Sequence, residues 1–241
     1  MKLLALLICF AGMASAETLA LLCAENDTTC DGAVAAFQAT GDFTSVVGFD
    51  TTTGTPMLSQ ISGFDSVLEW TDNTPADPTA LGNLLASYYA LGGKNLTVAS
   101  YSFSTGFGIG GTIMTGGYAG LTDSGTFVPA SGNLVATVPG DKIFNGIDLP
   151  TVSYYHAGLA DSSLASGATL LATDGAGVDL IARSSLGVID VNLYPGFVSG
   201  NNAEFYDLLA NTLVPEPTTL GFVGAGCLAL LVARRRRKIQ S

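Results

Sequence analysis

Short apolar runs recur along this chain, and a polar, glycine-rich or proline-containing segment follows most of them. Continuous apolar runs of this length are typical of strands that are covered on both faces of a sheet. The pattern predicts strands over residues 18–23, 45–50, 66–71, 96–101, 168–173, 178–183 and 187–192. Only three residues separate the last two runs, which indicates a hairpin.

Helical patterns alternate with these strands. The clearest helix begins at Asp77 and Pro78, a capping residue and a first-turn proline, and it stops before Gly92. Together with the strands on either side, it predicts a parallel crossover unit over residues 66–101. We also expect a polar loop at 27–31, helices at 32–40 and 201–213, and a single helical turn at 56–61.

The middle of the chain is less regular. Residues 102–130 are rich in Gly, Ser and Thr and are predicted to leave the carboxyl edge of the sheet, with short strands near 112–114. Residues 134–138 are expected to be extended, and 139–146 to form a turn or short helix. Strands that alternate with helices predict an α/β fold with three layers and a mostly parallel open sheet over residues 17–213.

The first 16 residues have the pattern of a secretory signal peptide. Lys2 precedes an apolar run at 3–12, and Ala14, Ser15 and Ala16 provide a small-residue end. We therefore expect export, with cleavage after Ala16.

The net charge of −11 conceals an asymmetry. Between residues 17 and 214 the chain has three basic and 19 acidic residues, a formal charge of −16. We call residues 17–214 the body of the protein. Its negative charge should repel nucleic acid and anionic polymers. We interpret the excess of acidic residues as a means of keeping the protein soluble outside the cell. A weak cation-binding surface is the alternative interpretation.

Export places the cysteines in an oxidising compartment, where disulfides can form. Cys9 and Cys227 lie in the terminal segments, which leaves Cys23 and Cys30 in the body. Seven residues apart in an oxidising compartment, they are candidates for a disulfide, with two buried thiols as the alternative. Neither has a neighbouring histidine or CxxC spacing, so catalysis by them is not expected.

The end of the chain has three parts in succession. A short motif precedes an apolar segment at 220–233, and a basic cluster follows it. The motif is Val214, Pro215, Glu216 and Pro217, and the cluster is Arg234, Arg235, Arg236, Arg237 and Lys238. The apolar segment is predicted to be a transmembrane helix, and the basic cluster would stay on the cytoplasmic side.

This tail, residues 214–241, closely resembles the PEP-CTERM sorting signal. The resemblance implies that the partner is an exosortase, a membrane enzyme of Gram-negative, often polysaccharide-producing, bacteria. The secretion machinery and the inner membrane are further implied partners, and exopolysaccharide is a candidate. The chain would be an anchored precursor that is cut near Pro215–Pro217 and delivered to the cell surface or extracellular matrix.

The body resembles the class I glutamine amidotransferase-like fold. The resemblance rests on residues 64–71, the helix from Asp77, the strand to Tyr101, and the segments 143–146 and 192–196. The segment 143–146 is similar to a turn of non-catalytic relatives, which include trehalose-utilisation-like proteins. The family's cysteine would follow the strand that ends at Tyr101, where this chain has none, so glutaminase activity is not expected.

Candidate chemistry is sparse. A candidate pocket at the carboxyl edge of the sheet would contain Asp72, Asp77, Ser102 and His156. A serine nucleophile needs a base, and His156 is the only histidine in the chain. Asp72 and Asp77 could bind Ca²⁺, but turn formation and helix capping explain them as well. Neither a cofactor nor a resident metal is expected.

Other patterns also have structural explanations. The glycine-rich residues 106–111 lack the Lys-Ser/Thr of a phosphate loop and are interpreted as a flexible loop. Several aromatic residues could stack on sugars, although most fall on predicted core elements.

The sequence therefore favours an exported, non-enzymatic surface or matrix protein. A secreted carbohydrate-active or hydrolytic enzyme is one alternative, and a sugar- or Ca²⁺-binding module at the carboxyl edge is the other.

Overall fold

The computed structural model describes residues 17–123, 125–155, 158–196 and 203–214. All of them belong to one compact unit, Glu17–Val214. The predicted signal peptide, His156, the sorting motif from Pro215 onward, the apolar segment and the basic cluster lie outside the described residues. Among the helices that are described, none combines the length and the apolar character needed to span a bilayer.

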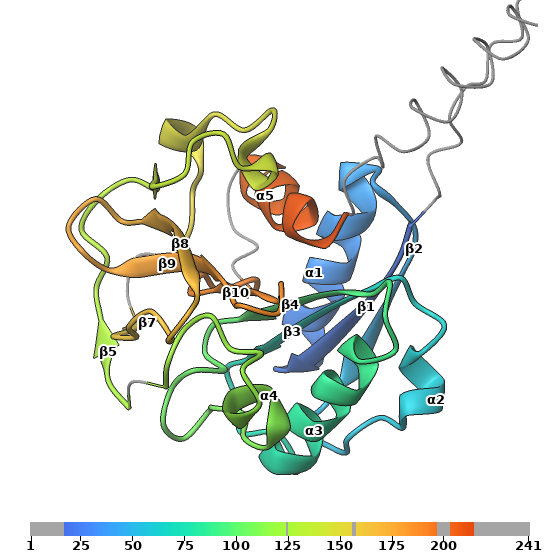
Figure 1. Cartoon of the computed structure of the whole chain (residues 1–241). Coiled ribbons are helices and arrows are strands. Elements are labelled where there is room, and N and C mark those ends of the chain that lie inside the picture. Colours follow the sequence, from blue (N-terminus) through green and yellow to red (C-terminus); the bar gives the residue numbers. More distant parts are fainter. Residues whose placement is uncertain (1–16, 124, 156–157, 197–202, 215–241) are drawn as a thin grey trace, which may run out of the picture. The chain divides into compact units, whose positions relative to one another are not determined.

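An eight-stranded mixed sheet forms the centre of the fold (Figure 1). Its strand order is β2-β1-β3-β4-β10-β9-β8-β6. In that order the strands are Phe43–Asp50, Glu17–Ala24, Ser66–Thr71, Asn95–Ala99, Ile189–Val191, Asp179–Arg183, Thr169–Thr173 and Val135–Ala136. The first five are parallel, and the last three are antiparallel.

The parallel part has the doubly wound order of flavodoxin-like sheets, with β10 as its fifth strand. The prediction of an α/β fold with a large, mostly parallel sheet is confirmed. A separate antiparallel pair joins β5 (Phe127–Val128) to β7 (Leu159–Ala160). The predicted hairpin is also confirmed, because β9 and β10 pair antiparallel.

Helices cover both faces of the sheet (Figure 1). On one face lie α1 (Asp27–Thr40) and α5 (Ala203–Leu213), and on the other lie α2 (Leu58–Ile61), α3 (Pro78–Tyr89) and α4 (Thr112–Thr115). Two 3-10 helices, η1 (Lys142–Phe144) and η2 (Leu149–Thr151), follow β6.

Each face has its own hydrophobic core, and strand alternation distributes residues between the two. Leu19 and Leu21 of β1 belong to the core under α1 and α5, whereas Ala20 and Leu22 belong to the core under α3. All four are fully buried, as expected of a strand covered on both sides.

A disulfide joins Cys23 near the end of β1 to Cys30 in the first turn of α1. Both cysteines belong to the core on the α1 face. The crosslink therefore ties together the strand, the helix and the short connection between them.

Two local predictions are wrong. Residues 27–31 are not a loop, because Asn26 caps α1 and its side chain accepts a hydrogen bond from the Thr29 N–H at 3.0 Å. Residues 112–114 are not a strand but lie in α4. Asn83 of α3 accepts a hydrogen bond from the Thr112 N–H at 2.8 Å, so the residue that supports this helical turn is remote in sequence.

Candidate functional site

The topological switch point of the sheet lies between β1 and β3. The chain leaves β1 toward β2 on one side and later returns to β3 on the other, and ligands of doubly wound sheets bind at the carboxyl ends of such strands. Glu25 follows β1 directly, and Asp72 follows β3 directly. Tyr101 comes shortly after β4, and Tyr194 after β10, so four neighbouring strands contribute to this edge.

Three donors converge on the Glu25 carboxyl. The backbone N–H of Asn26 donates to Oε1 at 2.8 Å, and its side-chain amide donates at 2.7 Å. The Tyr194 hydroxyl donates to Oε2 in a short hydrogen bond. The Glu25 side chain is therefore held in one orientation from both sides, and the residue is only 4% exposed.

Asp72 is the second carboxyl of this pair. Its backbone N–H donates to the carbonyl of Ala24, and its side chain lies within hydrogen-bonding reach of Glu25 and Tyr194. Burial, followed by the charge of Glu25 and the hydrogen bond to it, raises the pKa of Asp72 to about 6. The Asp72 carboxyl is therefore the group of this pair that takes up a proton at mildly acidic pH.

Aromatic rings surround the carboxyl pair. Tyr101 stacks on Tyr194 with ring centroids 5.5 Å apart, and Tyr155 meets the edge of Tyr194 at 6.2 Å. Phe127 contacts Tyr101 at 5.3 Å. Tyr155 and Phe127 are 38% and 43% exposed.

We call Glu25, Asp72, Tyr101, Tyr155 and Tyr194 the switch-point cluster. Carboxyl oxygens beside ring faces can accept hydrogen bonds from the hydroxyls of a ligand and pack against its apolar side. Among the residues that the structure describes, no three His, Cys, Asp or Glu side chains are grouped so that they could hold a metal ion.

The structure separates the predicted pocket residues. Asp72 belongs to the switch-point cluster, whereas Asp77 caps α3 by accepting a hydrogen bond from the Ala80 N–H at 2.9 Å. Ser102 is fully buried and donates to Glu69 at 2.7 Å. His156 lies outside the described residues. The prediction missed Glu25, although its place directly after the first strand matches that of Asp72 after the third.

A second pair of acids, Glu69 and Asp190, lies inside the fold. Glu69 of β3 and Asp190 of β10 are both in register with Val98 of β4, so they occupy one row on the same face of the sheet. They are 0% and 1% exposed. Asp190 accepts the N–H groups of Gly120 and Leu121 at 2.7 and 2.8 Å.

Each of these two acids keeps one oxygen, Glu69 Oε1 and Asp190 Oδ1, without a partner in the described part of the chain. Burial raises the pKa of Glu69 to about 8 and that of Asp190 to about 7. Glu69 is therefore mostly protonated at neutral pH. This pair lies in the interior and is distinct from the switch-point cluster.

The fold has a counterpart among solved structures. The crystal structure of SMU.1228c is similar with a TM-score of 0.55 and 13% sequence identity, over 81% of this chain and 98% of that chain. At this identity the similarity shows the fold alone, and the amidotransferase-like assignment stays a prediction.

The tail has a match of its own. No curated protein matches the chain. A family model described as the PEP-CTERM protein-sorting motif matches residues 213–238. The match covers the predicted motif, the apolar segment and the basic cluster, and it supports the sorting-signal prediction. A motif of this kind implies an exported protein that is processed by an exosortase.

Proposed function

We propose that this chain is the precursor of an exosortase-sorted protein of the cell surface or extracellular matrix. The signal peptide 1–16 directs export, and the segment 220–233 anchors the precursor in the inner membrane with residues 234–238 on the cytoplasmic side. Exosortase cuts near Pro215–Pro217 and frees the body. The sorting-motif match at 213–238 carries this proposal.

The way the body ends supports such a cut. Leu213 closes α5 and is fully buried, and the Val214 N–H still donates to the carbonyl of Ala210 at 3.0 Å. Pro215 and Pro217 are incompatible with continuing the helix. A cut beyond Val214 would therefore remove no described residue from either core.

We further propose that the body acts without catalysis of its own. Cys23 and Cys30 are joined in a disulfide, which removes both thiols as nucleophiles. The Ser102 hydroxyl is directed to the buried Glu69 carboxyl and is 0% exposed, which is unfavourable for attack on an external substrate.

Replacing Glu216 and Pro217 together by Ala should leave the precursor unprocessed. The variant should accumulate in the membrane fraction with its tail attached, because the proposed recognition motif is lost. Immunoblotting of membrane and surface fractions from an exosortase-containing host measures this. Thr218→Ala with Thr219→Ala is the matched control, since it changes two neighbours outside the motif and should be processed normally. Normal processing of the first variant would contradict the proposal.

A second candidate function is sugar binding at the switch-point cluster. The observation that favours it is the contact between the rings of Tyr101, Tyr155 and Tyr194 beside the Glu25 and Asp72 carboxyls. Neutral oligosaccharides present hydroxyls and apolar ring faces, which match these two kinds of group.

Titration with cellotetraose and maltotetraose, followed by NMR, tests this candidate. Tyr155→Ala should weaken binding about two- to tenfold, the range expected for the loss of one ring contact. The control is Leu186→Ala, because Leu186 is 49% exposed and lies in the β9–β10 turn. Absence of binding to the unaltered protein, or an equal loss in both variants, would exclude sugar binding of this kind.

A further inference from the structure

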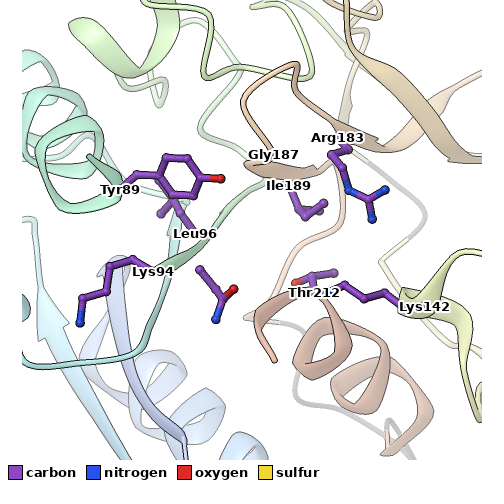
Figure 2. Close-up of a pocket in the computed structure, with 9 residues that line it drawn as sticks. Tyr89, Lys94, Leu96, Lys142, Arg183, Gly187, Ile189 and Thr212 are labelled. Atoms are coloured by element: carbon purple, nitrogen blue, oxygen red, sulfur yellow. The ribbon is translucent and has the colours of Figure 1, made fainter. Parts of the chain in front are cut away.

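A small pocket lies at the amino ends of β4 and β10, the edge of the sheet opposite the switch-point cluster (Figure 2). Its volume is about 70 Å³. It lies between the start of β4, the β9–β10 turn, η1 and the last turn of α5. Its lining consists of Tyr89, Lys94, Asn95, Leu96, Lys142, Arg183, Gly187, Ile189 and Thr212.

The charges of this lining are unlike those of the body. Lys94, Lys142 and Arg183 are the three basic residues between positions 17 and 214, a span that holds 19 acidic residues. All three line this pocket, and no acidic residue does. The pocket is thus a concentration of positive charge on an otherwise acidic protein, which favours an anionic ligand.

Arg183 is fixed in place by Asp141. The two guanidinium NH₂ groups donate to the two carboxylate oxygens at 2.7 and 2.9 Å. Burial alone would raise the pKa of Asp141, but the hydrogen bonds from Arg183 and the Ile143 N–H hold it below its ordinary value. Because arginine has five N–H donors, the pairing orients the guanidinium and leaves donors for a ligand.

Lys142 directly follows Asp141 and is positioned with it. The Lys142 ammonium donates to the carbonyl of Val214 at 3.3 Å, a neutral acceptor that leaves further protons available, and its charge, like that of Arg183, lowers the pKa of Asp141. Asp141 therefore offsets only one of the two positive charges of Lys142 and Arg183. Figure 2 shows Lys142 and Arg183 on the Thr212 side of the pocket.

The Lys94 ammonium makes its contacts away from Lys142 and Arg183. It donates to the carbonyl of Phe64 at 2.6 Å and lies 5.8 Å from the centroid of the Tyr88 ring. Burial and the charge of Asp65 raise the pKa of Glu17, and the charge of Lys94 opposes this effect, so Lys94 interacts with an acidic residue. In Figure 2 the Lys94 side chain extends away from Lys142 and Arg183. Lys94 thus lines the pocket without sharing a ligand position with the other two cations.

We propose that this pocket binds a small oxyanion of the phosphate or sulfate class, with Lys142 and Arg183 as its ligands. The pocket volume of about 70 Å³ is a few times the minimum that one water molecule needs, so it suits a small ion better than a large ligand. The Arg183 guanidinium supplies planar N–H donors, and Lys142 supplies a point charge, a combination suited to phosphate oxygens. The proposal does not depend on the sorting function of the tail.

Titration of the full-length protein with sodium phosphate at constant ionic strength tests this site. The ³¹P NMR shift should be saturable, with half-saturation on the order of 1 mM, the affinity that two or three charge-assisted hydrogen bonds supply. The melting temperature should rise over the same concentration range, whereas matched sodium chloride should leave it unchanged. A phosphate effect that does not saturate, or that chloride reproduces, would overturn the proposal.

Variants then locate the site. Lys142→Gln should weaken phosphate binding about tenfold, since one charged donor is lost. Lys94→Gln removes the same charge from the same pocket and should change affinity less than about twofold, because its ammonium is held elsewhere. An equal loss in both variants would mean diffuse charge attraction and would contradict the assignment. Arg183→Lys keeps the charge but loses the guanidinium, and it should also weaken binding.

A phosphate monoester distinguishes the two sources of the ligand. Glycerol 3-phosphate should bind as tightly as phosphate if the pocket accepts a group carried by a larger molecule. Weaker binding of the monoester than of phosphate would assign the pocket to the free ion. Either result is consistent with the oxyanion site itself, which the titration and the variants decide.

Discussion

Replacing Glu69 by Gln should raise the free energy of unfolding at pH 9 and reduce its dependence on pH. Burial raises the pKa of Glu69 to about 8, from an ordinary value of 4.5. The folded protein therefore keeps a proton that the unfolded chain releases. Stability is highest below the unfolded pKa, falls as pH rises toward the folded pKa, and stays low above it. Gln keeps the shape and carries no charge.

Each unit of pKa shift corresponds to about 1.4 kcal/mol, so the gain from Glu69→Gln at pH 9 should be on the order of 2–4 kcal/mol. The pKa of Asp190 is raised to about 7, so its ionisation also lowers the free energy of unfolding of the unaltered protein as pH rises. Both losses arise because a buried carboxylate lacks the solvation that water would provide.

Urea unfolding at pH 5, 7 and 9 measures this effect. The unaltered protein should lose stability across the series, and Glu69→Gln should lose much less. Asp31→Asn, at an exposed position of α1, is the control and should follow the unaltered protein. Stability that rises from pH 5 to pH 9 in the unaltered protein, or an identical pH dependence in Glu69→Gln, would show that Glu69 does not titrate as described.

Replacing Gly82 by Ala should destabilise the protein by about 3 kcal/mol, at the upper end of overpacking costs. In an exposed helix interior the same change is favourable by about 1 kcal/mol, because Ala has the higher helix propensity. At position 82 a Cβ atom would lie 1.8 Å from the carbonyl oxygen of Gly110 and 2.7 Å from the Ile113 side chain. Gly82 thus allows the loop before α4 to pack directly on α3.

Denaturant unfolding of Gly82→Ala against Gly63→Ala tests this close approach. A Cβ at Gly63 meets no atom within 4 Å, so that variant should stay within about 0.5 kcal/mol of the unaltered protein. A Gly82→Ala protein that is as stable as the control would mean that α3 and the Gly110 segment do not pack as described.

Local patterns were sufficient to predict most of the central sheet. The apolar run at 66–71 coincides with β3, and Asp77 with Pro78 marks the start of α3. These features depend on residues that are close in sequence: an uninterrupted apolar run, a capping side chain and a proline in the first turn. The start of α1 was missed because the capping role of Asn26 was not recognised.

The candidate site was harder to predict because it depends on strand order. Asp72 was named from its place after a strand, but Glu25 lies 47 positions earlier and meets it only because β1 and β3 are neighbours. Tyr194 reaches Glu25 from beyond β10. Likewise, α4 is supported by Asn83 from another helix. Periodicity along one segment holds no information on such contacts.

Glu69 shows a second limit of sequence patterns. A single acid within an apolar run is compatible with a solvent-facing position on a strand. Its burial follows from the layer of α3 and the loop containing Ser102, which cover that face of the sheet. The raised pKa is thus a property of the three-layer architecture rather than of the local sequence.

Intact-mass spectrometry of the protein recovered from the cell surface tests the central claim most directly. We expect a polypeptide that begins at Glu17 and lacks residues 220–241, because the signal peptide and the sorting tail have both been removed. The Glu216→Ala, Pro217→Ala protein recovered from the membrane should retain the basic cluster. Surface protein that still carries Arg234–Lys238 would contradict sorting by exosortase cleavage.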